Sequence, residues 1–226
     1  MEKNKAKTDK INNNKKFGKY TIGEEIASSI IHGIGAALAI SALVILLVYS
    51  IKGGDIWRVG AFSIYGTSLI LGFLASTLYH SLTNATAKRI FNKLDHSSIY
   101  LLIAGSYTPM TLIMRGGWGW SLFGVIWGMA IIGIILKCMF FGRFRWLSVT
   151  VYLIMGWLVI IAIKPVTQVF PKEFFYWLLL GGLSYSFGVI FYMMKKVKYT
   201  HAIWHLFVMG GSVLHFFGFL FYLTRI

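Results

Sequence analysis

Charged residues are scarce in this chain of 226 residues: they make up 13% of it, and only seven are acidic. A soluble domain is roughly 45–50% apolar and about 25% charged, whereas apolar and aromatic residues here reach 57%. So few charges cannot cover the surface of a soluble fold of this size. The composition excludes most soluble enzymes, coiled coils and disordered proteins, and it favours a multi-pass membrane protein.

We also expect neither a disulfide nor a cleavable leader. Cys138 is the single cysteine, so no internal disulfide can form. The first 20 residues carry seven lysines but no apolar core and no small-residue cleavage site, unlike a secretory signal peptide. We interpret residues 1–20 as a disordered basic cytoplasmic tail and residues 21–226 as one membrane domain.

Seven apolar stretches follow the tail, each near the ~20 residues that cross a bilayer. In lipid the backbone must satisfy its own hydrogen bonds, so these stretches are predicted to be helices. The fold class is therefore all-α integral membrane, a bundle of seven transmembrane helices. Glycines within the stretches, such as Gly124 and Gly128 or the pair Gly210 and Gly211, are interpreted as close helix contacts. The predicted spans are 25–50, 57–80, 94–114, 118–141, 146–163, 174–194 and 201–224.

The formal net charge of +15 is distributed unevenly between the loops. With the N-terminus in the cytoplasm, sixteen of the 22 lysines and arginines fall on the cytoplasmic side and six outside. This split follows the positive-inside rule, and an odd number of helices then places the C-terminus outside. Because the basic residues do not form one clustered face, we expect no nucleic acid as a partner.

Histidines from separate spans are predicted to meet at one membrane depth. His80 ends the second span, and His201 and His205 open the seventh, all on the cytoplasmic side. The four-residue spacing of His201 and His205 puts both imidazoles on one helix face, which is typical of helical zinc sites. With His80 they would supply three ligands and leave a fourth position for water. A packed, hydrogen-bonded histidine pair is the alternative interpretation.

Asp95 and Ser76 are the candidate catalytic residues beside this cluster. Asp95 opens the third span on the same side, where its carboxylate could accept a proton from a metal-held water or orient that water. Its alternative role is to cap the helix. Ser76 lies one turn before His80 and could hydrogen-bond the water or a substrate carbonyl, or instead a carbonyl of its own helix.

The other ionisable residues of the spans are predicted to have supporting roles. His96 is expected at a helix interface or behind the metal ligands. His215 lies 14 residues beyond His201, about 21 Å along the helix, too far for the same metal, so we interpret it as a core histidine. His32 and Glu25 could support the site or pair with the seventh helix, and Glu25 could instead extend to the membrane surface.

Four motifs, in order, resemble the bacterial haemolysin III proteins of the progestin and adipoQ receptor family, to which the adiponectin receptors also belong. In the first motif Ser28 stands where many relatives have Asn. This difference bears on a supporting contact made by the first helix and not on the zinc site. The resemblance extends from about residue 21 to the end, and it implies a bacterial plasma membrane protein. The motifs are EEIASSIIHGIGA (24–36), ASTLYHS (75–81), KLDHSSIYLLIAGSYTP (93–109) and HAIWHLFVMGGSVLHFF (201–217).

This resemblance implies a zinc site. His80, His201 and His205 match the zinc ligands of the adiponectin receptors, with Asp95 at the zinc-bound water and Ser76 near it. The wider superfamily includes alkaline ceramidases, which hydrolyse a lipid amide. Together with the residues themselves, the resemblance favours a zinc-dependent hydrolase of a membrane-lipid amide or ester, with membrane lipids as partners. A receptor or regulatory protein with a structural zinc and a haemolytic pore are the alternatives.

Overall fold

The computed structural model describes residues 16–17, 20–143, 145–194 and 196–224. In this part of the chain seven helices are long and apolar enough to cross a membrane, which confirms the predicted fold class. Most of the predicted tail lies outside the described residues; at its end, β1 (Lys16–Phe17) pairs antiparallel with β2 (Tyr20–Thr21). The helices are α2 (Ile22–Lys52), α3 (Ile56–Ser81), α4 (Ala85–Met114), α5 (Gly116–Met139), α6 (Arg145–Trp157), η1 (Leu158–Ala162), α7 (Ile163–Val169), α8 (Lys172–Met193) and α9 (Thr200–Tyr222).

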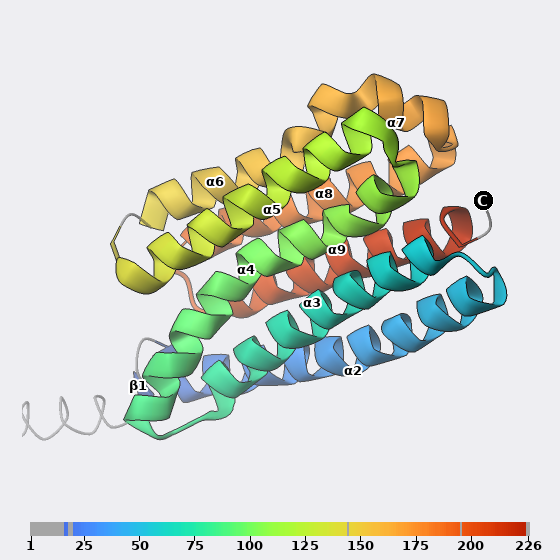
Figure 1. Ribbon diagram of the computed structural model, residues 1–226. Coiled ribbons are helices and arrows are strands. Elements are labelled where there is room, and N and C mark those ends of the chain that lie inside the picture. The colour runs from blue at the N-terminus through green and yellow to red at the C-terminus, as the bar shows by residue number, and fades with distance from the viewer. Residues whose placement is uncertain (1–15, 18–19, 144, 195, 225–226) are drawn as a thin grey trace, which may run out of the picture.

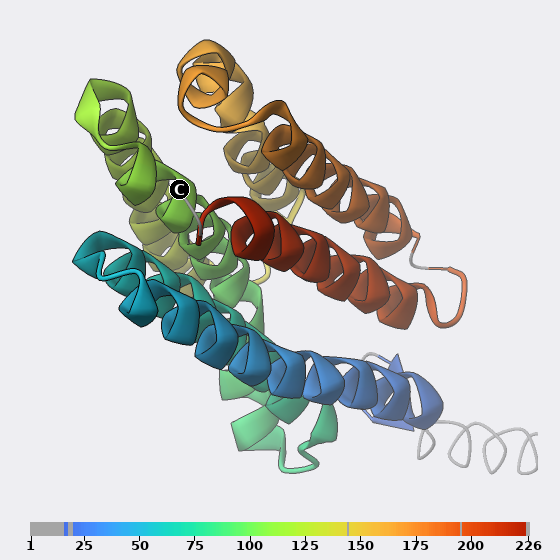
Figure 2. The same cartoon turned by 90° about the vertical axis from the view of Figure 1, so that its right-hand side faces the viewer.

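The helices form a closed bundle in which neighbours in sequence are mostly neighbours in space (Figures 1 and 2). From α2 to α5 each helix packs against the next, and α9 packs against both α8 and α2. The last helix therefore joins the first, and it can carry residues to a site shared with α2 and α3. We call the end of the bundle at which α2, α4 and α9 begin and α3 ends the histidine end; the C-terminus lies at the far end (Figure 1).

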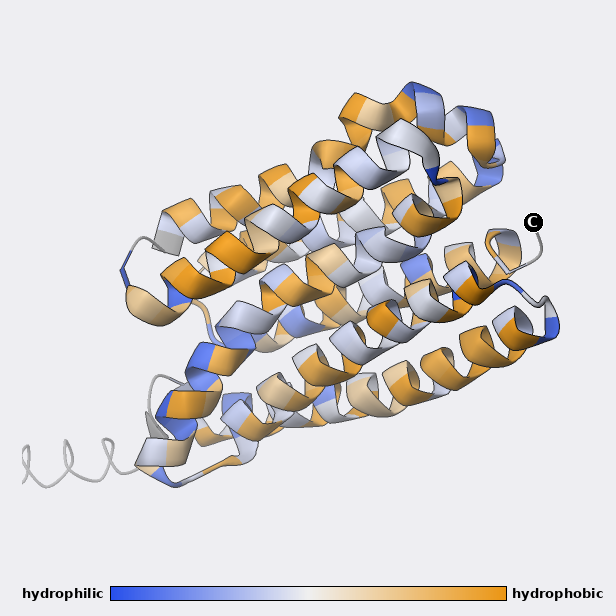
Figure 3. Cartoon of the chain, in the orientation of Figure 1, coloured by the Kyte–Doolittle hydropathy of each residue, from blue (hydrophilic) through white to orange (hydrophobic). Residues whose placement is uncertain are grey.

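The surface of α2 has the reverse polarity of a helix in a soluble protein. Isoleucines at four-residue spacing, among them Ile26, Ile30 and Ile34, are more than half exposed, while Glu25 and His32 on the opposite face are buried. An apolar outer face with polar groups inside is stable only where lipid surrounds the protein. Large hydrophobic residues are exposed on the other long helices too, and Figure 3 shows hydrophobic stretches along them, whereas the first turns of α4 are hydrophilic.

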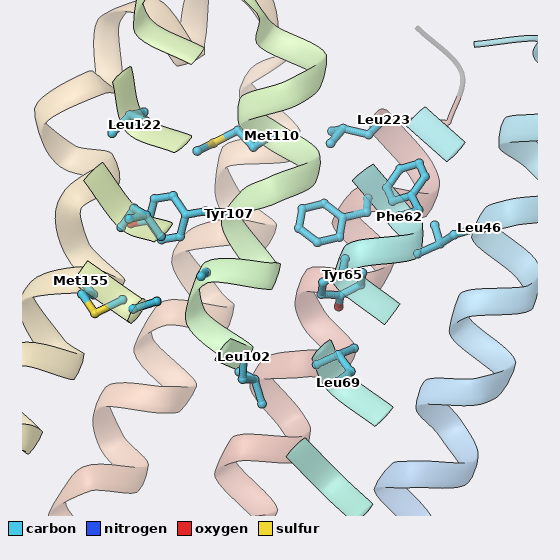
Figure 4. Packing of buried hydrophobic residues seen from close by; sticks show 14 of the residues in the cluster. Leu46, Phe62, Tyr65, Leu69, Leu102, Tyr107, Met110, Leu122, Met155 and Leu223 are labelled. Carbon is cyan, nitrogen blue, oxygen red and sulfur yellow. The ribbon is translucent and has the colours of Figure 1, made fainter. Parts of the chain in front are cut away.

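The apolar core extends from the far end of the bundle to Phe73, whose ring contacts His32. Phe62 and Tyr65 of α3 are buried, and both rings contact Phe219 of α9, with centroids 6.3 and 4.9 Å from it (Figure 4). Met110, near the end of α4, and Leu122, near the start of α5, belong to the same cluster. Apolar packing at the far end stabilises the bundle. The histidine end can therefore contain polar groups that stabilise the fold less than apolar packing does.

Helix α4 begins much earlier than its predicted span, 94–114. Asn84 caps it by accepting hydrogen bonds from the backbone amides of Thr86 and Ala87, both at 3.0 Å. The first turns of α4 are polar, so hydropathy does not reveal them. Asp95 therefore lies well inside the helix, and its alternative role as a cap is wrong. Apart from the end of the fifth span, the other predicted boundaries agree with the helices to within three residues.

The fifth span is broken into α6, η1 and α7 and ends later than the predicted residue 163. Tyr107 of α4 enters the break: its hydroxyl donates to the carbonyl of Gly156 and accepts from the amide of Val159, both at 2.9 Å. Pro165 has no N–H for the carbonyl of Ile161, and its ring crowds that carbonyl. A side chain inserted into the helical ladder and a proline together explain the break.

The glycines do not all have the predicted role. A Cβ atom at Gly211 would lie 2.8 Å from the ring of Tyr185, and one at Gly210 would lie 3.4 Å from Ser184 Oγ, so this pair confirms close packing of α8 and α9. Gly124 and Gly128 have no neighbour within 4 Å of such an atom among the described residues. Their interpretation as a helix contact within the chain is wrong, because they lie on an open face of α5.

Candidate metal centre

Three histidines from two helices meet at the histidine end, as the sequence predicts. His80 closes α3, while His201 and His205 lie on one face of the first turns of α9; all three are buried. Each offers a ring nitrogen, and these three atoms lie within 4.8 Å of one another. The nearest pair, His80 Nε2 and His205 Nε2, is 3.2 Å apart. Two ligands of a tetrahedral ion with bonds of about 2.0–2.1 Å stand about 3.3–3.4 Å apart, so this pair has ligand spacing.

A carboxylate orients His80. Glu25 of α2 is buried, and its Oε2 lies 2.6 Å from His80 Nδ1. A carboxylate there holds the proton on Nδ1, which leaves the Nε2 lone pair directed at the cluster. Lys88 of α4 lies 3.0 Å from Glu25 Oε1 and compensates its charge. The alternative position of Glu25 at the membrane surface is therefore wrong.

His201 is held from the other side by the segment that precedes α2. The hydroxyl of Tyr20 lies 3.2 Å from His201 Nδ1, and the two rings stack with centroids 4.4 Å apart. A second contact ties this segment to α9: Glu24 forms a capping box with Thr21 and accepts a hydrogen bond from the backbone amide of Tyr199 at 2.9 Å. The starts of α2 and α9 are thus joined beside the cluster.

Asp95 and Ser76 lie together next to the histidines. Both are buried, and the Ser76 hydroxyl interacts with the Asp95 carboxylate, which also interacts electrostatically with His80. Neighbouring hydroxyls such as that of Thr77 donate to a carbonyl of their own helix, whereas no such bond is present for Ser76 in the described chain. The structure thus places both candidate catalytic residues where the sequence predicts them.

The side chains fit a divalent metal ion. Besides the close pair of Nε2 atoms, Asp95 Oδ2 is buried without a hydrogen bond to any described residue, with His96 Nδ1 3.7 Å away. Buried polar atoms normally have partners, and a set of imidazoles with a nearby carboxylate suits zinc better than magnesium or calcium. The three histidines could therefore hold such an ion, with Asp95 beside its open side.

A cavity of about 170 Å³ leads from this centre into the bundle. Its walls come mainly from α4, α6, α8 and α9, and it reaches the metal centre at Asp95 and His32. Asp95 and Met110 of α4 both line it, so it extends about 22 Å along that helix at 1.5 Å per residue. That length exceeds half of a hydrocarbon core of about 30 Å, and the lining is mostly apolar, so the cavity can hold a long apolar chain.

The remaining predicted residues separate into two groups. His32 and His96 lie close to the centre: the rings of His32 and His205 are 3.8 Å apart, and His96 Nδ1 is 3.7 Å from Asp95 Oδ2. His215 does not join the cluster, because its Nε2 lies 3.2 Å from the carbonyl of Leu178, farther along α9. This agrees with its prediction as a core histidine.

Sequence reasoning missed two contributors and understated a third. Tyr20 lies in the segment that the sequence assigns to the tail, and Lys88 is one of the sixteen basic residues that the sequence places on the cytoplasmic side with no further role. Glu25 was recognised as unusual, but its partner was not, because 55 residues separate it from His80. The available signal was a pair of adjacent acidic residues at the start of a strongly apolar helix, which is costly unless the carboxylates are paired.

Fold and site together define a class: a seven-helix membrane protein with a buried three-histidine cluster at one end of the bundle. The family model described as "Haemolysin-III related" matches residues 20–216. The chain belongs to this haemolysin III family, as its four motifs indicate.

Individual relatives agree with this assignment. "Hemolysin-3" of Bacillus cereus is 51% identical over 202 residues, which cover 89% of this chain and 92% of that protein. "Hemolysin-3 homolog" of Bacillus subtilis (strain 168) is 48% identical over 208 residues, 92% of this chain and 98% of that protein. A more distant relative is the human "Monocyte to macrophage differentiation factor", 30% identical over 178 residues, 76% of this chain and 74% of that protein.

Proposed function

We propose that this protein is a zinc-dependent hydrolase of a membrane-lipid amide or ester in the bacterial plasma membrane. The observation that carries the proposal is the junction of two features: three buried imidazoles with ligand spacing, and an apolar cavity that reaches them at Asp95. An acyl chain in the cavity would bring its carbonyl to the metal centre. A receptor with a purely structural zinc does not require an apolar cavity that reaches the metal centre.

Each polar residue has a defined task in this proposal. When bound, zinc supplies a Lewis acid and activates water at neutral pH. Asp95 accepts the proton of the attacking water, because its Oδ2 has no other hydrogen bond among the described side chains. The Ser76 hydroxyl, beside Asp95, donates to the oxygen on which charge develops. Glu25 and Tyr20 keep the rings of His80 and His201 in position.

The experiment is a metal analysis combined with a hydrolysis screen. Purified protein is loaded with zinc and incubated with a total bacterial lipid extract and with separate amide- and ester-linked lipids, and released fatty acid is measured by mass spectrometry. The proposal predicts release from at least one class, and loss of that release after chelation. If zinc-loaded protein releases no fatty acid from any class, the receptor or regulatory function becomes the better explanation.

Lysis is tested with the same preparation, because two relatives carry the name haemolysin. The walls of the cavity are mainly apolar, whereas a water-filled pore needs polar groups along its length. We therefore expect no dye release from vesicles at protein amounts that hydrolyse lipid. Dye release that persists in the Asp95→Asn variant would instead support a pore.

A further inference from the structure

His32 of α2 is a buried polar side chain that makes no hydrogen bond to the described residues. It is 5% exposed, and neither ring nitrogen has a partner in the described part of the chain. Its neighbours on the adjacent helices are rings: Phe73 of α3 in an edge contact at 5.2 Å, and His205 of α9 at 3.8 Å between centroids. These are packing contacts between rings, and they satisfy neither nitrogen of His32.

An imidazole always carries at least one N–H donor, whichever tautomer it adopts. Leaving such a group buried and unpaired is costly, so a protein rarely keeps one without a use. The side chain also lines the cavity that ends at Asp95. A molecule in that cavity can therefore supply the acceptor that the protein does not.

The distribution of polar groups along the cavity indicates which end of a bound molecule lies next to the metal centre. Farther from the metal centre, donors of the lining bond to other groups of the protein: Tyr107 donates to the carbonyl of Gly156, and the Trp157 indole donates to Ser186. His215 Nε2 donates to the carbonyl of Leu178, which leaves its Nδ1 without a hydrogen bond among the described residues but as an acceptor only, unable to bind a carbonyl oxygen. At the other end, His32 has an N–H with no acceptor among the described residues, and Asp95 Oδ2, which lies 3.7 Å from His96 Nδ1, accepts no hydrogen bond from them. A ligand that fits both ends has one polar group next to the histidines and a long apolar chain.

We propose that His32 is the hydrogen-bond donor for the carbonyl oxygen of a long-chain lipid bound in this cavity. The inference rests on the proposed function only in assuming that the cavity admits such a lipid. His32 binds and orients the carbonyl beside the metal centre, while the metal ligands and Asp95 keep their separate tasks.

The test is a binding measurement with two probes that cannot be hydrolysed, octadecan-3-one and octadecane. They differ by one carbonyl group. Equilibrium binding of the tritiated compounds is measured for zinc-loaded protein in detergent, and the ratio of the two dissociation constants is taken within each variant. A general change in cavity packing affects both probes and cancels in this ratio.

The wild-type protein should prefer the ketone, and His32→Leu should lower that preference about tenfold, as expected for one lost hydrogen bond. His32→Gln, which keeps an N–H donor, should retain most of it. Zinc content should be the same in all three proteins. His215→Leu is the matched control: it removes another cavity histidine, one whose Nε2 pairs with Leu178, and should leave the preference intact.

Two results would overturn the inference: a wild-type protein with no preference for the ketone, or a His32→Leu variant with the full wild-type preference. The first is measurable even if the variants do not fold. Because the binding test needs no turnover, its failure differs from failure of the hydrolase proposal. If the preference for the ketone depends on His32 but no lipid is hydrolysed, the inference stands and the hydrolase proposal is rejected. If lipid is hydrolysed but the preference does not depend on His32, the hydrolase proposal stands and the inference is rejected.

Discussion

Glu25 Oε2 lies 2.6 Å from His80 Nδ1, and Glu25 Oε1 lies 3.0 Å from the ammonium of Lys88. One side chain of α2 thereby joins a histidine of α3 to a lysine of α4. The carboxylate orients the imidazole, and the lysine makes a buried charge tolerable in the membrane. This arrangement links the candidate metal ligand His80 to the packing of three helices.

The first prediction concerns this carboxylate. Glu25→Gln keeps the shape of the side chain but loses the charge that holds the proton on His80 Nδ1. We expect zinc affinity to fall about 10- to 100-fold, the usual effect of removing a partner of a metal-binding histidine. Competition with a chromophoric chelator measures it. Glu173→Gln, a change of an exposed residue at the far end, is the control, and equal affinities in both variants would contradict the role of Glu25.

The second prediction concerns the metal itself. Purified protein should hold about one zinc per chain, because three neutral imidazoles suit that ion. His205→Ala should lose most of it, whereas His215→Ala should keep it, since His215 pairs with the carbonyl of Leu178 instead. Plasma emission spectrometry on dialysed protein gives the content. Equal zinc in the wild type and in the triple alanine variant of His80, His201 and His205 would reject the site.

The third prediction separates chemistry from structure at Asp95. Asp95→Asn preserves size but cannot accept the proton of water. Loss of a positioned general base costs about 10²–10⁴ in rate, so fatty-acid release should nearly disappear while zinc content and thermal stability stay close to wild type. Asp55→Asn, which alters an ion pair with Arg115 at the far end, should hydrolyse normally. A variant that loses its zinc and unfolds would mean that the Asp95 carboxylate is structural.

The fourth prediction addresses the break in the fifth span. Tyr107→Phe removes the hydroxyl that bonds Gly156 and Val159. Hydrogen bonds between membrane helices contribute modestly, about 0.6 kcal/mol each on average and up to about 1.7, so the two together should lower stability by about 1–2 kcal/mol. Thermal unfolding in detergent would detect this loss. The control is Tyr176→Phe, at an exposed position, which should unfold at the same temperature as the wild type. An unchanged unfolding temperature for Tyr107→Phe would mean that its hydroxyl does not stabilise the break.

The fifth prediction is the orientation in the membrane. Sixteen of the 22 basic residues fall on the side of the N-terminus under the seven-span topology, so the histidine end should face the cytoplasm. A reporter active only outside the cytoplasm should work when fused after Ile226 and fail when fused before Met1. The reverse pattern would place the metal centre on the outer side, and equal signals from both fusions would contradict an odd number of spans.

Much of this architecture could be predicted because the relevant signals are local in sequence. Hydropathy and segment length identify seven helices, and residue number then sets the depth of each polar side chain, since a helix rises 1.5 Å per residue. That reasoning brings His80, His201 and His205 to one level and keeps His215 away. It fails at the start of α4, whose polar first turns carry no apolar signal.

The tertiary structure alone decides which of these groups touch. Depth says nothing about how a helix is rotated about its axis, and rotation is set by the packing of side chains on neighbouring helices. Glu25 meets His80 across 55 residues, and Tyr20 meets His201 across 181. The cavity likewise exists only between helices, so neither it nor the position of His32 in its wall can be read from any one segment of the chain.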